Sequence, residues 1–384
     1  TRTTIPTLSV VGGIHVRLHP SRHDHLLIEF VDEQGINISK AKEKKIEGAY
    51  FKEDLRRAQI PEIGEVFYPA QVLDVYSHSF ENLLNVEAVN NSRAKVVIDY
   101  AYAVSGAVLP LLLGKFGCDA VVLNASLSQT ALSNDERETL LIELGQVVEA
   151  LKANMGVQVA ANGEQLILVD ESGLPIRGEI LTALMVNMMM TAHPRSTVVV
   201  PVHASSAVEQ IARRHDGNVT RTKASPTALM EACQKDPNVV LGGSGETGFI
   251  FPELHPGFDA MFCIAKLIEM LTVQERSLAE IRTELPRVCH KSYTMRCPWT
   301  VKGALMRYLV ETHPADELEL IDGVKVIDPR TDNWVLVLPD AGEPLVHIFA
   351  NGDDRAWVDQ ALREYRQRVQ DFIDQEQGVE AVNV

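Results

Sequence analysis

Histidine and arginine side chains gather near the start of the chain. Four of the twelve histidines and two arginines lie between residues 15 and 25: His15, Arg17, His19, Arg22, His23 and His25. Guanidinium groups bind phosphate oxygens, and a histidine can carry a phosphoryl group covalently. On a strand, His15, Arg17 and His19 would share one face. This segment is therefore either a phosphate or metal pocket, with His19 as the catalytic candidate and Arg17 and Arg22 as phosphate-binding candidates, or a polar loop in solvent.

A second polar pair lies in the glycine-rich segment 242–248. Here Glu246 and Thr247 stand side by side among four glycines. A carboxylate and a hydroxyl on such a loop can form hydrogen bonds with the hydroxyl groups of a sugar. The same residues also fit an ordinary glycine-rich turn. Glu246 and Thr247 are accordingly candidate sugar-binding residues, with the structural alternative left open.

The elements that must position these residues alternate between strand and helix. Short apolar runs at 95–99 and 120–123 flank a helical pattern at 104–115, which predicts a βαβ unit and a parallel sheet. The same order returns further along: strand 197–201, helix 206–215, strand 218–222, helix 226–233 and strand 239–241. Two such units, roughly a hundred residues apart, predict two similar α/β domains side by side.

The two ends of the chain have a different pattern. Before the first unit we predict two strands, a charged helix and a linking helix: residues 9–18, 26–32, 40–47 and 68–84. After residue 286 we predict a smaller α+β domain: helix 299–311, strands 323–327, 334–338 and 345–349, and helix 354–373. The resulting division has four parts: 1–74, 75–193, 194–288 and 289–384.

The composition excludes several classes of partner. With 46% hydrophobic and 23% charged residues among 384, the chain can bury a large core. A net charge of −16 repels nucleic acid and anionic membranes. The five cysteines show no metal-ligand spacing, which is typical of reduced thiols in the cytosol. Without a visible signal peptide or a run long enough to span a membrane, we expect a cytoplasmic protein.

Three segments carry a family resemblance: 160–173 (AANGEQLILVDESG), 242–252 (GGSGETGFIFP) and 338–344 (LPDAGEP). With the order of the blocks, they resemble the phosphoglucomutase/phosphomannomutase family, the phosphohexomutases. This resemblance covers nearly the whole chain and implies three α/β domains and a smaller C-terminal domain around a central cleft. The first domain would be incomplete, because the family has a further βα portion before it. The chain also begins with Thr1 rather than Met, so we expect a fragment or a processed product.

In the family, four loops meet in the cleft: one carries a phosphoserine, one binds Mg²⁺, one recognises the sugar and one holds the substrate phosphate. The phosphoserine loop, roughly T-A-S-H-N-P, has His19 here in place of the serine. The metal loop, D-G-D-A-D-R, has Ala160, Asn162 and Glu164 in place of its aspartates, and Gln165 in place of its arginine. One carboxylate and one amide neutralise Mg²⁺ poorly, so no cofactor is expected.

The other two loops differ from each other in what they retain. In the sugar loop, G-E-x-S-G, Glu246 and Thr247 can stand for the family's acid and hydroxyl after a one-residue slip. In the phosphate loop, R-P-S-G-T-E-P, the arginine, serine and threonine are replaced by Leu338, Asp340 and Gly342. An aspartate repels a phosphate dianion, and nothing replaces the arginine fork. Three of the four loops therefore lack the groups that phosphoryl transfer needs.

This degenerate pattern is similar to that of one subgroup of the family. Residues 296–303 (RCPWTVKG) and 334–340 (WVLVLPD) resemble mutase-like regions that follow a sugar-phosphate nucleotidyltransferase, as in bacterial mannose-1-phosphate guanylyltransferase fusions. The resemblance implies a fused or associated nucleotidyltransferase domain as a partner. Any guanylyltransferase activity would belong to that partner, since this chain has no glycine-rich nucleotide loop of that type.

Three functions remain to be compared. We expect a catalytically inactive phosphohexomutase-like domain of nucleotide-sugar metabolism that binds a sugar phosphate or nucleotide sugar, or regulates the nucleotidyltransferase. One alternative is an active phosphomannomutase or phosphoglucomutase, an intramolecular phosphotransferase in which His19 replaces the phosphoserine. The other alternative is a purely structural oligomerisation module.

Overall fold

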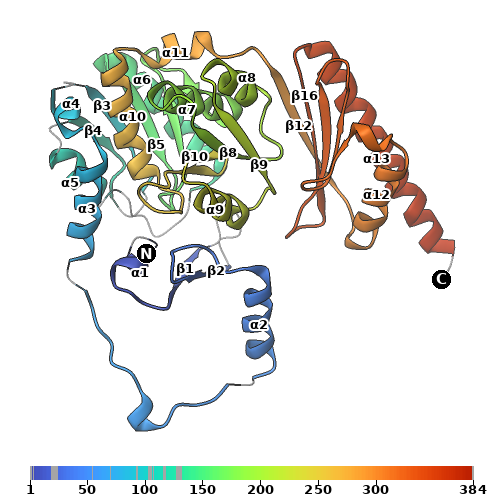
Figure 1. Ribbon diagram of the computed structural model, residues 1–384, viewed down its shortest axis with the longest axis horizontal. Coiled ribbons are helices and arrows are strands. Elements are labelled where there is room, and N and C mark those ends of the chain that lie inside the picture. Colours follow the sequence, from blue (N-terminus) through green and yellow to red (C-terminus); the bar gives the residue numbers. More distant parts are fainter. Residues whose placement is uncertain are drawn as a thin grey trace.

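The computed structural model describes the chain except residues 1, 3, 19–24, 54, 70, 92–93, 103–105, 107, 116–117, 127–131 and 383–384. Its strands are β1 Gly12–Leu18, β2 Leu26–Asp32, β3 Lys95–Asp99, β4 Asp119–Leu123, β5 Met155–Val159, β6 Leu166–Val169, β7 Pro175–Ile176, β8 Thr197–Pro201, β9 Asn218–Thr222, β10 Val239–Ser244, β11 Gly248–Ile250, β12 Cys289–Arg296, β13 Leu318–Glu319, β14 Val324–Ile327, β15 Trp334–Pro339 and β16 Leu345–Gly352. They form separate sheets, as Figure 1 shows.

The helices connect and cover these sheets. They are α1 Thr4–Thr7, α2 Lys40–Phe51, α3 Val72–Leu83, α4 Val86–Asn91, α5 Leu109–Lys115, α6 Asn134–Leu151, α7 Gly178–Ala192, α8 Ala207–Arg214, α9 Pro226–Lys235, α10 Ala260–Gln274, α11 Leu278–Glu284, α12 Trp299–Glu311 and α13 Arg355–Val382. Short 3₁₀ helices span Ile60–Glu62 and Ala315–Glu317. Within the described residues, no helix has both the length and the apolar character needed to cross a membrane.

The N-terminal part is a hairpin with a long extension. Strands β1 and β2 pair antiparallel along their whole length, from Gly12 opposite Asp32 to Leu18 opposite Leu26. Helix α2 stands apart from the other elements (Figure 1) and has no buried residue. The linking helix predicted at 68–84 is shorter in the structure, since α3 begins at Val72. Strand β1 begins at Gly12, later than the predicted start at residue 9, and a Cβ at position 12 would lie only 2.7 Å from the Val31 carbonyl oxygen.

Two α/β sheets lie side by side in the middle of the chain, which confirms the predicted pair of α/β domains (Figure 1). In the first, β3 lies between β4 and β5 and pairs parallel with both, while β6 and β7 continue antiparallel. In the second, β8 lies between β9 and β10 in the same way, and β11 is antiparallel. Helix starts follow local chemistry: Ser133 and Glu136 form a capping box at α6.

One apolar core joins these two sheets. Helix α7 is buried on nearly all sides, with its four methionines at or near zero exposure: Met185, Met188, Met189 and Met190. Such an all-round apolar helix is stable only inside a core. In the same cluster, the ring of Phe262 in α10 makes edge-to-face contacts with Phe80 of α3 and with Phe251. The two α/β sheets are therefore held as one unit on which the loops can be positioned.

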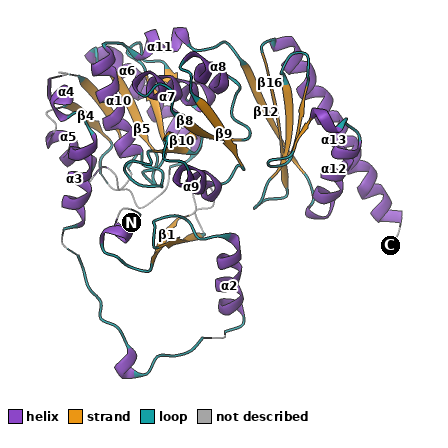
Figure 2. Ribbon diagram, in the orientation of Figure 1, coloured by secondary structure: helices purple, strands orange, loops and turns teal. Residues whose placement is uncertain are grey.

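The C-terminal domain is an antiparallel sheet in the order β12-β16-β15-β14-β13. Figure 2 shows α12 and α13 on the side of this sheet away from the other domains, where their apolar faces form a core with it. The opposite face packs Trp334, Leu336 and Leu338 against Val202, which follows β8. The predicted helix 299–311 is confirmed, and the last helix extends further than predicted, to Val382.

Candidate functional site

The loops that the sequence singles out meet beyond the carboxyl ends of the parallel strands. Loop 160–165 follows β5, and loop 242–248 joins β10 to β11. The Gln165 side chain donates from Nε2 to the Glu246 carbonyl at 2.8 Å. Gly248, at φ +94°, lies against the backbone carbonyl of Glu164, where any Cβ would be only 2.1 Å from that oxygen. Only glycine allows this close approach, so the sequence fixes the contact between the two loops.

Glu164 is the acidic side chain of loop 160–165, and it already has partners. Asn162 donates from Nδ2 to Glu164 Oε2 at 2.9 Å and accepts from the Glu164 backbone amide at 3.1 Å. Arg2 lies with its Nε 3.7 Å from Glu164 Oε1. Burial raises the pKa of Glu164, while the charge of Arg2 acts in the opposite direction. The loop is therefore closed by its own side chains and by Arg2.

Mg²⁺, which the resemblance implies, does not fit these residues. The ion needs oxygen ligands with several negative charges to replace its water. Loop 160–165 offers the Glu164 carboxylate alone, and that group is bonded to Asn162 and paired with Arg2. Among the described residues, no group of three or more His, Cys, Asp or Glu side chains could hold a metal. No step of a mechanism through this ion follows from the site.

The N-terminal hairpin presents its polar face near Glu164. Arg17 donates from Nε to Glu29 Oε2 at 2.8 Å, and His15 Nδ1 lies 3.4 Å from the same oxygen. Burial acts to raise the pKa of Glu29, but the hydrogen bond and the charge of Arg17 outweigh it and lower this pKa below its usual value. The candidate phosphate ligand Arg17 is thus engaged by Glu29. The other two candidates of this segment, His19 and Arg22, lie outside the described residues.

Loop 338–344 is closed by Asp340. Its Oδ1 accepts from the backbone amides of Gly342 and Glu343, each at 2.7 Å, and its Oδ2 accepts from His347 Nε2 at 3.0 Å. Burial alone would raise the pKa of Asp340, but the hydrogen bonds from His347 and Gly342 lower it. The carboxylate therefore occupies the donors that an incoming phosphate would need.

Lys302 of α12 anchors the same loop through two of its backbone carbonyls. Its ammonium donates to the Asp340 carbonyl at 2.7 Å and to the Glu343 carbonyl, and it lies over the Trp299 ring, 3.7 Å from the centroid. The residue is only 8% exposed. The sequence segment 296–303 thus contributes the anchor of loop 338–344.

The two candidate sugar-binding residues, Glu246 and Thr247, differ in exposure and in their hydrogen bonds. Glu246 is exposed over 57% of its side chain, and its Oε2 lies 3.7 Å from His203 Nε2. The Thr247 hydroxyl is used by the turn itself: it accepts from the Ser244 amide at 3.0 Å and contacts the Ser244 hydroxyl at 3.1 Å. Glu246 is free to meet a ligand, whereas Thr247 stabilises the loop. His203 follows β8 at the strand's carboxyl end, the position where α/β domains place ligand-binding residues, and that signal could have identified it.

Two titratable side chains near Glu246, Glu179 and His203, have strongly shifted pKa values. Burial raises the pKa of Glu179 to about 7, opposed by the amide of Ser205, which donates to Glu179 Oε2 at 2.7 Å. The other oxygen, Oε1, is buried without a partner. Burial lowers the pKa of His203 to about 4, so this imidazole is neutral at pH 7. Its ring stacks on Phe349 of β16, with centroids 5.0 Å apart.

The raised pKa of Glu179 predicts a pH-dependent stability. Between pH 4.5 and about 7 the folded state holds a proton that the unfolded state has lost, so the free energy of unfolding falls as pH rises through this window. Because Glu179 is not fully buried, we expect the Glu179→Gln variant to be more stable than the wild type by ~1–2 kcal/mol at pH 8.5, with no difference at pH 4.5.

Urea unfolding at the two pH values measures this difference. The matched control is Glu143→Gln, which changes an exposed carboxylate on α6 and should show no pH-dependent gain. A Glu179→Gln variant whose stability differs from the wild type by the same amount at both pH values would contradict the assignment.

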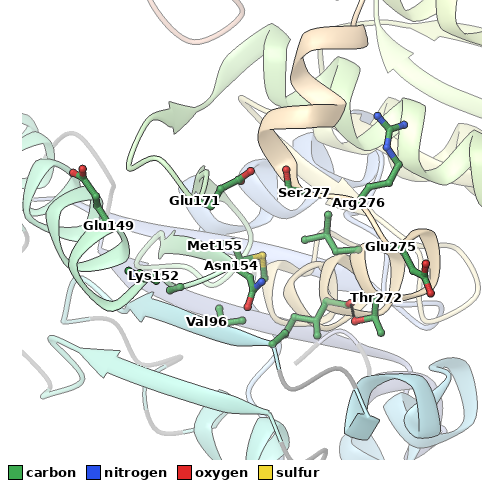
Figure 3. Close-up of a pocket in the computed structure, with 14 residues that line it drawn as sticks. Val96, Glu149, Lys152, Asn154, Met155, Glu171, Thr272, Glu275, Arg276 and Ser277 are labelled. Carbon is green, nitrogen blue, oxygen red and sulfur yellow. Dashed lines mark hydrogen bonds between the residues drawn. The ribbon is translucent and has the colours of Figure 1, made fainter.

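A cavity lies at the opposite end of the α/β sheet that contains β3 and β5. It has a volume of about 480 Å³ and is lined by the start of β5, the end of α6 and the turn before α11 (Figure 3). Its polar side chains are engaged: Glu171 accepts from the Ala279 amide at 3.3 Å, Arg276 pairs with Glu284, and Ser277 caps α11. Because it opens at the amino ends of the parallel strands, it is separate from the loops described above.

Comparisons with known proteins match these domains. The family models for phosphoglucomutase/phosphomannomutase α/β/α domain II and domain III match residues 74–173 and 177–289, respectively. A phosphoglucomutase/phosphomannomutase of Thermococcus kodakarensis is 28% identical over 361 residues, which are 92% of this chain and 76% of the relative. A probable phosphoglucosamine mutase of Methanopyrus kandleri is 26% identical over 374 residues, 96% of this chain and 80% of the relative.

Solved structures agree in fold. A phosphoglucomutase/phosphomannomutase family protein from Burkholderia thailandensis superposes with a TM-score of 0.77 at 18% identity, covering 93% of this chain and 75% of that one. A putative phosphomannomutase from Thermus thermophilus gives 0.74 at 16% identity, covering 96% and 80%. These structures show that the fold is shared, and the two domain matches, at 74–173 and 177–289, establish the family. The chain belongs to the phosphohexomutases, the family of the phosphoglucomutases and phosphomannomutases.

Proposed function

We propose that this phosphohexomutase-like protein binds a sugar phosphate or nucleotide sugar in its central cleft without transferring the phosphoryl group. The observation that carries this proposal is the Asp340 carboxylate, which accepts from two backbone amides and from His347 in the loop that would hold the substrate phosphate. An anion is already built into this loop. A phosphate dianion would have to displace it and would meet its negative charge.

The closed state of loop 160–165 supports the same proposal. Phosphoryl transfer depends on neutralising the charge that spreads over the transferred group, usually by a divalent cation. Glu164 is paired with Arg2 and bonded to Asn162, so this loop offers no site for that cation. The reaction needs positive charge at the transferred group and at the held phosphate. In loops 160–165 and 338–344, the groups at these two places are instead bonded to each other.

A binding role remains open to the exposed Glu246. Its carboxylate is 57% exposed beside the neutral His203. A carboxylate accepts hydrogen bonds from sugar hydroxyls, and a neutral imidazole can donate or accept. This pair therefore provides the recognition of a hexose, while the adjacent loop 338–344 contacts the rest of the ligand less tightly than an arginine fork would.

An active mutase is the second candidate, and the comparisons are what favour it. The relatives from Thermococcus and Methanopyrus, similar over at least 92% of this chain, are named as mutases. In that case the phosphoryl group would be carried in the segment around His19. We also propose a fused or associated sugar-phosphate nucleotidyltransferase as the partner, supported by the resemblance of segments 296–303 and 334–340.

A coupled mutase assay of the purified chain separates these functions. It uses mannose-1-phosphate and glucose-1-phosphate with Mg²⁺ and a hexose-1,6-bisphosphate activator, and an active mutase of the family as positive control. We expect no turnover above the blank, together with a rise in melting temperature on adding mannose-1-phosphate or GDP-mannose. The rise should be lost in Glu246→Ala and kept in Glu143→Ala, which removes an exposed carboxylate far from the loops.

The outcomes have distinct meanings. Turnover that is abolished by His19→Ala contradicts the proposal and establishes an active mutase. A rise with GDP-mannose alone favours a ligand shared with a guanylyltransferase. Neither turnover nor any rise also contradicts the proposal, and would leave a structural module.

A further inference from the structure

The C-terminal domain is attached to the third domain mainly by contacts between side chains. The chain crosses from one to the other once, between the end of α11 at Glu284 and the start of β12 at Cys289. The apolar part of the boundary is the packing of Val202 and Ala224 against the outer face of the C-terminal sheet. Apolar packing alone allows sliding, because it has no directional preference. Polar groups at the same boundary must therefore set the orientation.

Asn351 of β16 is the most buried of these polar groups, at 0% exposure. Its Oδ1 accepts from the Ser205 hydroxyl at 3.0 Å and from the Ser206 backbone amide at 3.2 Å. Its Nδ2 donates to the Ser206 hydroxyl at 2.7 Å. One side chain of the C-terminal domain thus uses both ends of its amide on the residues that precede α8.

The partners of Asn351 have few alternatives. The backbone amides at the start of a helix have no acceptor within the helix. Around α8 they are supplied from outside: Glu179 accepts from Ser205, and Asn351 accepts from Ser206. Removing Asn351 leaves the partly buried Ser206 amide and the buried Ser205 hydroxyl without acceptors, which is more costly than the loss of a hydrogen bond in water.

A second polar contact lies elsewhere on the same boundary. The Ala224 amide, just beyond β9, donates to Asp322 Oδ2 of the C-terminal domain at 3.0 Å. The same boundary contains the stack of His203 on Phe349, and His203 in turn lies beside Glu246. The boundary therefore fixes where loop 242–248 stands relative to loop 338–344.

We propose that Asn351 is an interdomain latch: its side-chain amide holds the C-terminal domain on the start of α8, and breaking it frees that domain to move about residues 285–288. The latch thereby sets where loop 242–248 stands relative to loop 338–344. This inference concerns domain position only, so it stands or falls independently of the ligand and of turnover.

Hydrogen exchange of the full chain tests the latch at a distance from the mutation. In Asn351→Leu, which keeps the size but removes both hydrogen-bonding atoms, the Ala224 amide should exchange at least fivefold faster than in the wild type. The radius of gyration from X-ray scattering should increase as well. The matched control is Gln158→Leu, which removes another buried amide whose partner, Asp99, lies at the end of β3, outside the boundary with the C-terminal domain. It should leave Ala224 exchange unchanged.

The opposite result is equally specific. Faster exchange at Ser206 with unchanged exchange at Ala224 and unchanged scattering would show that Asn351 only caps α8, and would overturn the proposal. If Asn351→Leu does not fold, the double variant Ser205→Ala/Ser206→Ala removes the partner hydroxyls from the other side and is read in the same way.

Discussion

Replacing Asp340 with serine is expected to tighten the binding of mannose-1-phosphate by tenfold to a hundredfold. In the wild type the carboxylate accepts from the amides of Gly342 and Glu343 and from His347. Serine leaves these donors free, adds a hydroxyl and removes a negative charge. Two like charges a few ångströms apart near a protein surface repel by a few kcal/mol, and each ~1.4 kcal/mol is a factor of ten in affinity.

Calorimetric titration at low and moderate salt measures this gain. Asp340→Asn separates its two causes, because the amide removes the charge but still occupies one backbone donor; its gain should be smaller. Asp328→Ser is the matched control, since Asp328 caps another turn of the same domain through Arg330 and Thr331. If neither substitution at position 340 tightens binding, loop 338–344 is not an anion site and the basis of the proposed function is wrong.

The fold could largely be predicted because its central strands are short, apolar and bounded by clear signals. The predicted strands 95–99, 197–201 and 218–222 coincide with β3, β8 and β9. Strand β12 was missed for a physical reason. Its sequence, CHKSYTMR, is mostly polar, and it pairs along its whole length with β16, more than fifty residues later in the sequence. Nothing local in such a segment distinguishes it from a loop.

The site could be predicted in one respect and not in another. Comparison with the family's loops identified the unusual residues, such as Glu164 and Asp340, because a changed residue type is visible in the sequence. Their partners are not visible, since Arg2 meets Glu164, and Lys302 meets the Asp340 carbonyl, only in the folded chain. The sequence therefore predicted which groups were lost, while the structure shows that internal hydrogen bonds and ion pairs have taken their place.

The internal hydrogen bonds and ion pairs bear on how the differences from the family's loops are interpreted. A loop that has lost its ligands by drift alone would have unpaired donors facing the cleft. Here the amides of loop 338–344 are bonded to Asp340, and the carboxylate of loop 160–165 is bonded to Asn162. The substituted residues thus stabilise the loops in the absence of a ligand, which supports the proposal that these loops do not take part in phosphoryl transfer.

The largest loss of stability is expected in the Lys302→Met variant. Methionine keeps the apolar stem of the side chain but removes the ammonium that donates to the carbonyls of Asp340 and Glu343 and lies over Trp299. Because Lys302 is 8% exposed, water cannot replace these hydrogen bonds. Two carbonyls without donors and a lost charge-assisted pair should lower the free energy of unfolding by about 2–4 kcal/mol.

Urea unfolding at pH 7 measures this loss, with Lys291→Met as the matched control. Lys291 pairs with Asp359 in the same domain but is 35% exposed, so its loss should be below about 1 kcal/mol. Equal losses in the two variants would contradict the anchoring role of Lys302.

The Lys302 anchor also affects the first prediction, because without Lys302 the amides of loop 338–344 no longer converge. The double variant Asp340→Ser/Lys302→Met should therefore lose most of the affinity that Asp340→Ser gains, because an anion site needs positioned donors as well as the absence of a competing charge.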